Sequence, residues 1–170
     1  AGISTESGIP DFRSPNGIWS KYKPVEYQDF IALESARTQY WKMKSESYRN
    51  YADVKPNIGH FMVTHFQLEK KLLGVITQNV DGLHQMAGVP ANRVIELHGT
   101  DRKVHCLSCQ KEYEPEPLFK VFDETQVPPD CEYCRGLLKS ATVSFGQAMP
   151  EAGMKLAKQW CQAADLFVVI

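Results

Sequence analysis

The sequence has almost no surplus charge, no long hydrophobic run and no internal repeat. Its 170 residues contain 19 Lys and Arg against 20 Asp and Glu, a formal net charge of −1. The broad basic face that nucleic-acid binding requires is therefore missing. No apolar run approaches the ~20 residues of a membrane-spanning helix, and no secretory signal is recognisable. We expect an intracellular, cytoplasmic protein that contacts neither a membrane nor nucleic acid directly.

A GxGxxG motif is also lacking, although the N-terminal segment is rich in Gly, Ser and Pro. Gly2 and Gly8 allow the close backbone approach that phosphates and ribose rings require. Arg13 can pair with an anionic group, and Phe12 offers a flat ring for stacking. The segment is either a plain surface loop or a packed functional loop, and its scattered apolar residues favour the second. By itself it is a weak indication of nucleotide binding.

Two short β-branched runs, residues 75–77 and 94–97, occupy the middle of the chain. Each is typical of a strand in a parallel sheet. Polar residues follow both runs, namely Gln78, Asn79, Asp81 and His98. Because ligands of open α/β sheets bind beyond the carboxyl ends of the strands, these side chains are expected in one crevice. The alternative is that the amides cap the next helix and the imidazole closes a turn.

Helical periodicity surrounds these strands. Residues 25–51 repeat apolar side chains at steps of three and four, at Phe30, Leu33, Ala36, Tyr40 and Met43. Asn57 is placed to cap a second amphipathic helix, whose apolar face carries Ile58, Phe61, Met62, His65 and Leu68. Residues 141–145 and 166–170 predict further strands of the sheet, and the helix between them places Cys161 in the core. This order predicts a doubly wound α/β fold.

Four of the five cysteines form two CxxC pairs, Cys106 with Cys109 and Cys131 with Cys134. Two such pairs can place four thiolates around one tetrahedral Zn²⁺. Disulfides or a thioredoxin-like redox pair are the alternatives, and the lack of secretory features favours structural zinc. Four thiolates leave no open position for water, so we expect this metal to support folding and not catalysis.

Several longer motifs follow one another along the chain: GISTESGIPDFR, TQNVDGLH, ELHGT and the paired CxxC knuckles. In this order they resemble the sirtuins, NAD-dependent protein lysine deacylases, over residues 1–170. The resemblance implies a Rossmann-like parallel sheet with an inserted small zinc-binding and helical module, and NAD⁺ in the crevice between them. It implies removal of an acyl group, acetyl by preference, from protein lysines, with nicotinamide, acyl-ADP-ribose and free lysine as products.

The resemblance also assigns roles to individual residues. His98 matches the catalytic base. The residues that match the cofactor site are Ala1, Gly2, Ile3, Ser4, Asp11, Phe12, Arg13, Gln78, Asn79, Asp81 and His98. The strand that pairs with the acyl-lysine peptide by β-augmentation is matched by Val143, Phe145 and Gly146. Within a single catalytic domain over residues 1–170, residues 20–55 match a helical cofactor-loop module and residues 104–137 the zinc-binding module.

The sequence departs from the family pattern at several points. The family's strand and glycine before Ala1 and its Gly-[ST]-[ST] segment after Ile170 do not occur, so we expect a truncated domain that is inactive or weak by itself. Gln147 replaces a common Glu, and residues 140–141 replace Pro-Asp or Pro-Asn, which bears on peptide preference. The Tyr-x-x-Arg motif of deacylases for acidic acyl groups is missing near Lys44, a weaker candidate cation, and this favours an uncharged acyl group.

Two alternative functions are considered. Mono-ADP-ribosyl transfer shares the NAD⁺ pocket and differs in the acceptor. A zinc ribbon that binds a protein or nucleic acid without catalysis needs a basic, aromatic surface near the knuckles. That segment is instead acidic, with Glu112, Glu114, Glu116, Asp123, Glu124 and Asp130.

Overall fold

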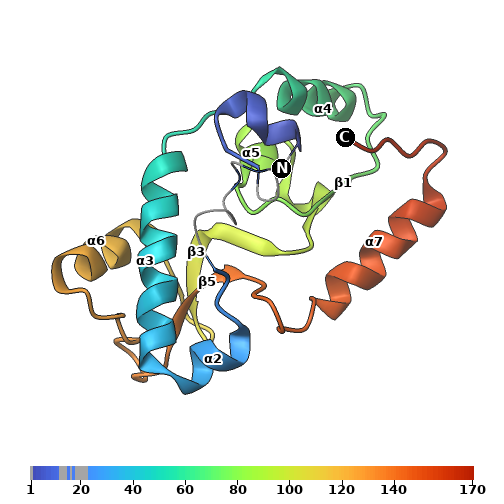
Figure 1. The fold of residues 1–170 in the computed structure, drawn as a ribbon. Helices are drawn as coiled ribbons and strands as arrows, with labels where there is room; N and C mark the ends of the chain where they lie inside the picture. Colours follow the sequence, from blue (N-terminus) through green and yellow to red (C-terminus); the bar gives the residue numbers. More distant parts are fainter. Residues whose placement is uncertain (1, 12–14, 16, 18–22) are drawn as a thin grey trace.

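The computed structural model describes residues 2–11, 15, 17 and 23–170. Figure 1 shows the elements along the chain. They are the 3-10 turn η1 (Gly2–Ser7), α2 (Tyr27–Ala32), α3 (Glu34–Tyr51), α4 (Ile58–Leu68), β1 (Val75–Thr77), α5 (Leu83–Met86), η2 (Ala91–Arg93), β2 (Val94–Glu96), β3 (Gly99–Cys106), β4 (Glu112–Tyr113), α6 (Pro115–Thr125), β5 (Leu138–Thr142) and α7 (Glu151–Ala163). Within the described part of the chain, no helix is long and apolar enough to cross a membrane.

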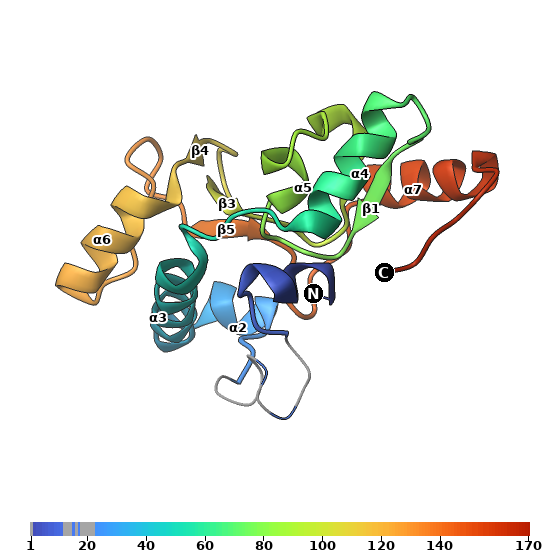
Figure 2. The ribbon, with the colours of Figure 1, turned by 90° about the horizontal axis from the view of Figure 1, so that it is seen from above.

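β1 and β2 form the parallel pair that the sequence predicts. Val75 pairs with Val94, and the chain passes from one strand to the other through α5 and η2. Behind the pair, the ring of Trp160 in α7 fills the space beside Gly74, where an added Cβ would lie 2.1 Å from the ring. In Figures 1 and 2, β1 lies between α4 and α7. Helices on both sides of parallel strands match the predicted doubly wound order.

A second sheet is antiparallel and carries the cysteine pairs. β3 lies between β4 and β5, and α3 and α6 pack beside it, as Figure 2 shows. Trp41 of α3 is 1% exposed, its ring meets that of Phe119 in α6 edge-on at 5.4 Å, and its Nε1 donates to the Leu138 carbonyl at 3.3 Å. Residues far apart in the sequence therefore share one hydrophobic core around Trp41.

The helical pattern over residues 25–51 is divided into two helices. Leu33 adopts an extended backbone between α2 and α3, with φ −120° and ψ 125°. Arg37 Nη1 donates to the carbonyls of Phe30 and Ile31 at 3.2 and 3.1 Å, which satisfies the end of α2. Because of this break Leu33 leaves the predicted apolar stripe and is exposed.

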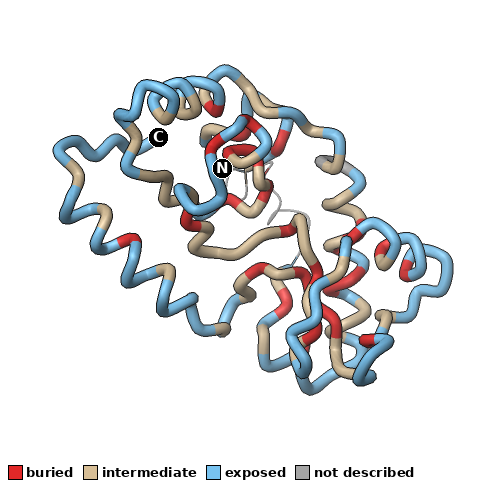
Figure 3. The backbone as a smooth tube through the Cα atoms, turned by 180° about the vertical axis from the view of Figure 1, so that it is seen from behind, coloured by how far each residue is buried: buried red, intermediate tan, exposed pale blue. Residues whose placement is uncertain are grey.

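The face of α4 that the sequence predicts to be apolar is largely exposed. Phe61 and Leu68 are 50% and 71% exposed, and Figure 3 shows much of this helix in the colour of exposed residues. The buried His60 and the half-buried Thr64 instead lie on the side that faces α5, where Thr64 Oγ1 donates to the carbonyl of Ala87, the residue after α5, at 3.0 Å. His65, expected to be partly buried, is exposed.

Two further predictions for the parallel sheet are wrong. Residues 141–145 do not join it, because β5 ends at Thr142 and pairs with β3. Residues 166–170 form no strand, and their side chains are 58–83% exposed. An apolar run forms a strand only where another strand pairs with it, and among the described strands none pairs with residues 166–170. Cys161, expected in the core, is exposed on α7.

Asn57 caps α4 as predicted and also holds η1. Its Oδ1 accepts from the N–H of Gly59 at 2.9 Å, while its own N–H donates to His60 Nδ1 at 3.3 Å. Its Nδ2 donates to the Ile3 carbonyl at 2.7 Å and to Ser7 Oγ at 2.9 Å. One side chain therefore starts a helix and fixes the N-terminal turn.

Replacing Asn57 should consequently cost more than an ordinary surface change. Asn57→Ala is expected to lower the free energy of unfolding of the full-length protein by about 1–2 kcal/mol, the usual cost of losing an N-cap. Urea denaturation followed by circular dichroism measures this value. Asn92→Ala, an exposed position in η2, is the matched control and should stay within about 0.5 kcal/mol of the parent protein. Equal losses in both variants would contradict the anchoring role.

Candidate active site

A buried polar cluster lies where the carboxyl end of β1 meets η1. Ser4 Oγ donates to Asp81 Oδ2 at 2.7 Å and accepts from Asn79 Nδ2 at 2.9 Å. All three side chains are at most 8% exposed. The structure therefore brings together three residues that the sequence analysis assigned to a cofactor site, from two distant segments.

Asp81 connects this cluster to two further elements. Its Oδ1 accepts from the N–H of Leu83 at 3.0 Å, which starts α5. Its backbone carbonyl accepts from Arg102 Nε in β3 at 2.7 Å. Gly82, which follows, has φ 69°, a left-handed conformation that glycine adopts without strain. The carboxylate is thus fixed in position and orientation from several sides.

His98 follows β2 and is half-buried. Its Nδ1 lies 3.1 Å from the backbone carbonyl of Gln78, which follows β1. A carbonyl oxygen only accepts hydrogen bonds, so Nδ1 carries a hydrogen, and in the neutral imidazole the lone pair is then at Nε2. The ends of the two parallel strands therefore meet as predicted, and the imidazole is held in a tautomer that can accept a proton at Nε2.

Two buried histidines beside this cluster were not assigned a role from the sequence. His60 and His84 are 0% and 5% exposed, and their rings meet edge-on at 5.0 Å. Burial lowers the pKa of both imidazoles, and the nearby Asp81 carboxylate opposes this shift. Both rings are consequently neutral near pH 7. Of the two, only His60 could have been predicted from the sequence to take part in a helix cap, because it stands three residues after the cap residue Asn57.

The four CxxC cysteines form one compact cluster. Their four Sγ atoms all lie within 4.8 Å of one another, with Cys106 and Cys134 at 3.5 Å and Cys109 and Cys131 at 3.7 Å. Four sulfurs around a tetrahedral Zn²⁺ lie about 3.8 Å apart, given Zn–S bonds of about 2.3 Å. Tyr113 Oη lies 3.0 Å from Cys131 Sγ, and this contact is the main cause that lowers the pKa of Cys131 to about 6. The cluster fits a metal site.

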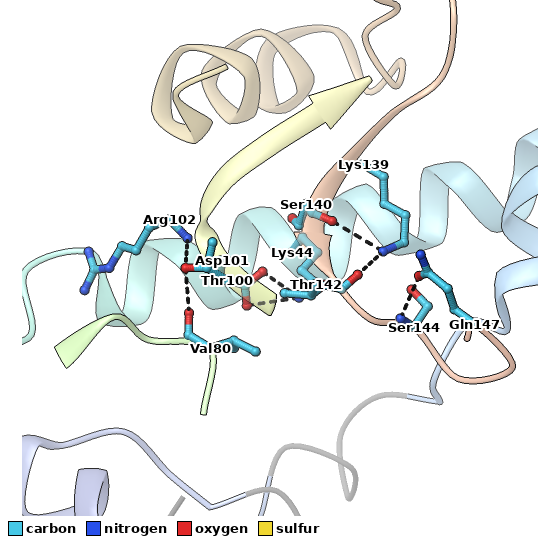
Figure 4. A network of polar contacts seen from close by, with 10 residues as sticks. All are labelled: Lys44, Val80, Thr100, Asp101, Arg102, Lys139, Ser140, Thr142, Ser144 and Gln147. Carbon is cyan, nitrogen blue, oxygen red and sulfur yellow. Dashed lines mark hydrogen bonds and ion pairs between the residues drawn. The ribbon is translucent and has the colours of Figure 1, made fainter. Parts of the chain in front are cut away.

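The segment expected to bind a peptide follows β5. The Val143 N–H donates to the His98 carbonyl at 2.8 Å, and the Phe145 carbonyl accepts from the Tyr27 N–H at 2.8 Å. Gln147 closes a turn, since its N–H donates to the Ser144 carbonyl and its Oε1 accepts from the Ser144 N–H, both at 3.0 Å (Figure 4). Phe145 itself is 50% exposed.

The remaining predicted cofactor residues are only partly placed. Gly2 and Ile3 lie in η1 beside Ser4, and Asp11 is half-buried farther along the same segment. Ala1, Phe12 and Arg13 lie outside the described residues.

Lys44, the candidate cation for an acidic acyl group, is already paired. Its Nζ lies 2.7 Å from Asp101 Oδ1 and 3.0 Å from Oδ2, as Figure 4 shows. Burial alone lowers the pKa of Lys44, but the Asp101 carboxylate outweighs it and the net pKa is raised. This ammonium group is therefore charged, and its charge is balanced within the protein.

The fold is that of a Rossmann-like α/β protein with an added four-cysteine module. A family model described as the Sir2 family matches residues 1–170, and the chain belongs to the Sir2 family, the sirtuins. This membership confirms the resemblance and the fold class predicted from the sequence.

Three similar proteins illustrate this membership. An NAD-dependent protein deacetylase of Thermodesulfovibrio yellowstonii is 46% identical, over 100% of this chain and 66% of that protein. An NAD-dependent protein deacetylase of Rhodopseudomonas palustris is 41% identical, over 100% of this chain and 67% of that protein. A solved structure of Sir2 with a p53 peptide and NAD⁺ has a TM-score of 0.80 and 32% identity, over 94% of this chain and 62% of that chain. The chain thus spans about two thirds of the length of its relatives.

The two buried imidazoles predict a pH dependence of stability. Below about pH 6.5, the ordinary pKa of histidine, the unfolded chain binds protons that the folded chain does not. Stability is therefore fully present above this pH and falls as the pH is lowered towards the depressed pKa values. The slope contributed by each histidine is at most about 1.4 kcal/mol per pH unit.

Denaturation of the full-length protein at a series of pH values checks this prediction. His84→Gln should flatten the slope between about pH 6.5 and pH 5, because one of the two buried titrating groups is gone. His65→Gln, an exposed position on α4, should keep the slope of the parent protein. A parent-like slope in His84→Gln would refute the assignment.

Proposed function

We propose that this protein uses NAD⁺ to remove acetyl, or another uncharged acyl group, from lysines of proteins. Nicotinamide, acyl-ADP-ribose and free lysine would be the products. The buried Ser4–Asn79–Asp81 cluster at the carboxyl end of β1 carries the proposal, together with membership of a family whose relatives are NAD-dependent protein deacetylases. Mono-ADP-ribosyl transfer is the alternative, and no contact of the described residues favours it.

The hydrogen-bonding groups of the cluster suit the nicotinamide end of NAD⁺. Asn79 offers an amide and Asp81 a carboxylate, and such groups can bind and orient a carboxamide without acting as nucleophiles. Both are held in place before any ligand arrives, which reduces the cost of binding. We assign Gly2, Ile3 and Ser4 to the same site because they belong to the turn fixed by Asn57 and Asp81, and Ala1, Asp11, Phe12, Arg13 and Gln78 by their motifs.

The Ser4–Asn79–Asp81 cluster would hold the nicotinamide end of NAD⁺, and the bound cofactor would supply the ribose carbon to which the acyl oxygen is joined as nicotinamide is released. His98 is proposed as the general base. Its Nδ1 donates to the Gln78 carbonyl, so Nε2 is the atom that takes the proton of a ribose hydroxyl. Imidazole is the side chain that most often acts as a general base towards a hydroxyl group.

The acyl-lysine peptide is proposed to add a strand beside Val143, Phe145 and Gly146. The backbone there is already fixed at one end by His98 and at the other by Tyr27. Lys44 does not favour an acidic acyl group, because its charge is balanced by Asp101. This pairing supports the preference for an uncharged acyl group.

We further propose that Cys106, Cys109, Cys131 and Cys134 hold one structural Zn²⁺. Four thiolates complete the coordination shell and leave no position for substrate. Residues 104–137 then form the zinc-binding module and residues 20–55 a helical cofactor-loop module, both within one sirtuin catalytic domain that contains residues 1–170.

Incubating the full-length protein with NAD⁺ and an acetyl-lysine peptide tests the proposed activity. Mass spectrometry should show loss of the acetyl group from the peptide and appearance of acetyl-ADP-ribose. Transfer of ADP-ribose to a protein, with the acetyl group retained, would favour the alternative. A panel of peptides that differ only in the acyl group should place acetyl above succinyl.

His98→Ala should lower the rate of deacylation by about 10²–10⁴-fold, the usual contribution of a general base. NAD⁺ affinity, measured by calorimetry, should change little because His98 is proposed to act after binding. His65→Ala, on the exposed face of α4, serves as control. A parent-like turnover number in well-folded His98→Ala would remove His98 from the mechanism.

Cys131→Ser should release the metal and destabilise the protein, because a structural zinc contributes folding free energy directly. Elemental analysis should find about one zinc per chain in the parent protein and a clear loss in the variant. Cys161→Ser, which removes the exposed thiol of α7, should keep the full zinc content. Zinc-free folded protein with disulfides between the four cysteines would disprove the site.

A further inference from the structure

Lys139 of β5 is a fully buried cation that the proposed mechanism does not use. Its side chain is 0% exposed, and within the described part of the chain no carboxylate lies within ion-pairing distance of it. Lysine is almost never fully buried without a partner, because removing an ammonium group from water costs free energy. A residue kept in such a position needs a compensating set of contacts.

Those contacts are backbone carbonyls and an aromatic ring. Lys139 Nζ donates to the carbonyls of Ser140 and Thr142, as the dashed lines of Figure 4 show. It also lies 5.5 Å from the centre of the Tyr40 ring, a distance at which the ring attracts a cation. Lys44 lies 5.8 Å from the centre of the same ring and is neutralised by Asp101. The Nζ of Lys139 therefore binds backbone carbonyls at the end of β5.

Both polar atoms of the peptide group between Thr142 and Val143 form hydrogen bonds. Its oxygen accepts from Lys139 Nζ. Its N–H donates to the His98 carbonyl at 2.8 Å. A peptide group is planar, so these two bonds together fix its orientation at the point where the chain leaves β5. The segment that begins there is the one expected to bind the peptide.

The same region is tied to the end of β1 through β3. The N–H of Asp101 donates to the Val80 carbonyl at 2.8 Å, one residue before Asp81. Asp101 and Thr142 are buried, at 6% and 7% exposed. Because β5 pairs with β3, the fixed peptide group belongs to the same sheet that this hydrogen bond joins to the end of β1, next to the proposed cofactor cluster.

We propose that Lys139 is a positioning residue that sets the direction in which residues 143–146 leave β5, and thereby the fit of the acyl-lysine peptide. This inference rests on the function proposed above for that segment. Lys139 itself touches neither substrate nor cofactor. It acts through the Thr142 carbonyl, so its loss should affect the peptide much more than NAD⁺.

Lys139→Met in the full-length protein tests this role, because methionine keeps an unbranched side chain only one atom shorter and removes the donors. The KM for the acetyl-lysine peptide should rise about tenfold, the effect of losing one hydrogen bond from a charged group. The KM for NAD⁺ should stay within about twofold, a change smaller than one weak hydrogen bond would cause. Hydrogen exchange of residues 140–148 should accelerate about tenfold, because the Val143 N–H is released more often.

Two further variants separate positioning from a general loss of stability. Lys139→Arg keeps a cation with N–H donors and should restore most of the exchange protection and of the peptide KM. Lys103→Met removes a half-exposed lysine of β3 that pairs with Glu114, and it should match the parent protein in all three measurements. Melting temperatures of the same samples show whether each variant is folded.

The result that overturns the inference is unchanged exchange and unchanged peptide KM in Lys139→Met. An equal rise of the KM values for peptide and NAD⁺ would overturn it too. If the parent protein does not deacylate the peptide, the proposed function fails. The exchange measurement then decides by itself whether Lys139 fixes the peptide group.

Discussion

The carboxylate of Asp81 is the constraint on which the rest of the site depends. It accepts from Ser4 in η1 and from the N–H of Leu83 at the start of α5, and its backbone carbonyl accepts from Arg102 in β3. A 3-10 turn as short as η1 has little stability of its own. Its position is therefore set by Asp81 on one side and by Asn57 on the other. The proposed cofactor turn is shaped by tertiary contacts made before any ligand binds.

A second constraint governs the passage from the parallel sheet to the antiparallel one. His98 ends the first and Gly99 begins β3 with φ 72°. A Cβ at Gly99 would lie 2.0 Å from the Ala141 carbonyl oxygen, so only glycine lets β3 and β5 approach here. This close approach lets the His98 carbonyl bind the Val143 N–H. The proposed base and the proposed peptide strand are thus placed by one backbone contact, which explains why glycine directly follows the histidine.

The parts of the structure that were predictable from sequence have local causes. The cap at Asn57, the two parallel strands and the cysteine pairs follow from spacing and residue type over a few positions. The pairing of residues 141–145 and the buried side of α4 depend on which neighbour offers an edge or a face, and a periodic pattern does not contain that information. Lys139 is the clearest case, since a lysine in a strand is ordinarily expected at the surface.

Burial also fixes the electrostatic sign of the proposed nicotinamide pocket. His60 and His84 stay neutral because burial lowers the pKa of both, so they add no positive charge beside the Asp81 carboxylate. The nicotinamide ring of NAD⁺ is cationic, and a fixed negative charge with little water around it attracts such a ring more strongly than one in solvent. Protonation of the two imidazoles would reverse the local sign. In the proposed pocket the two histidines would therefore act through their neutrality. A hydrophobic residue in place of His60 would preserve the sign but lose the hydrogen bond that Nδ1 accepts from the Asn57 N–H.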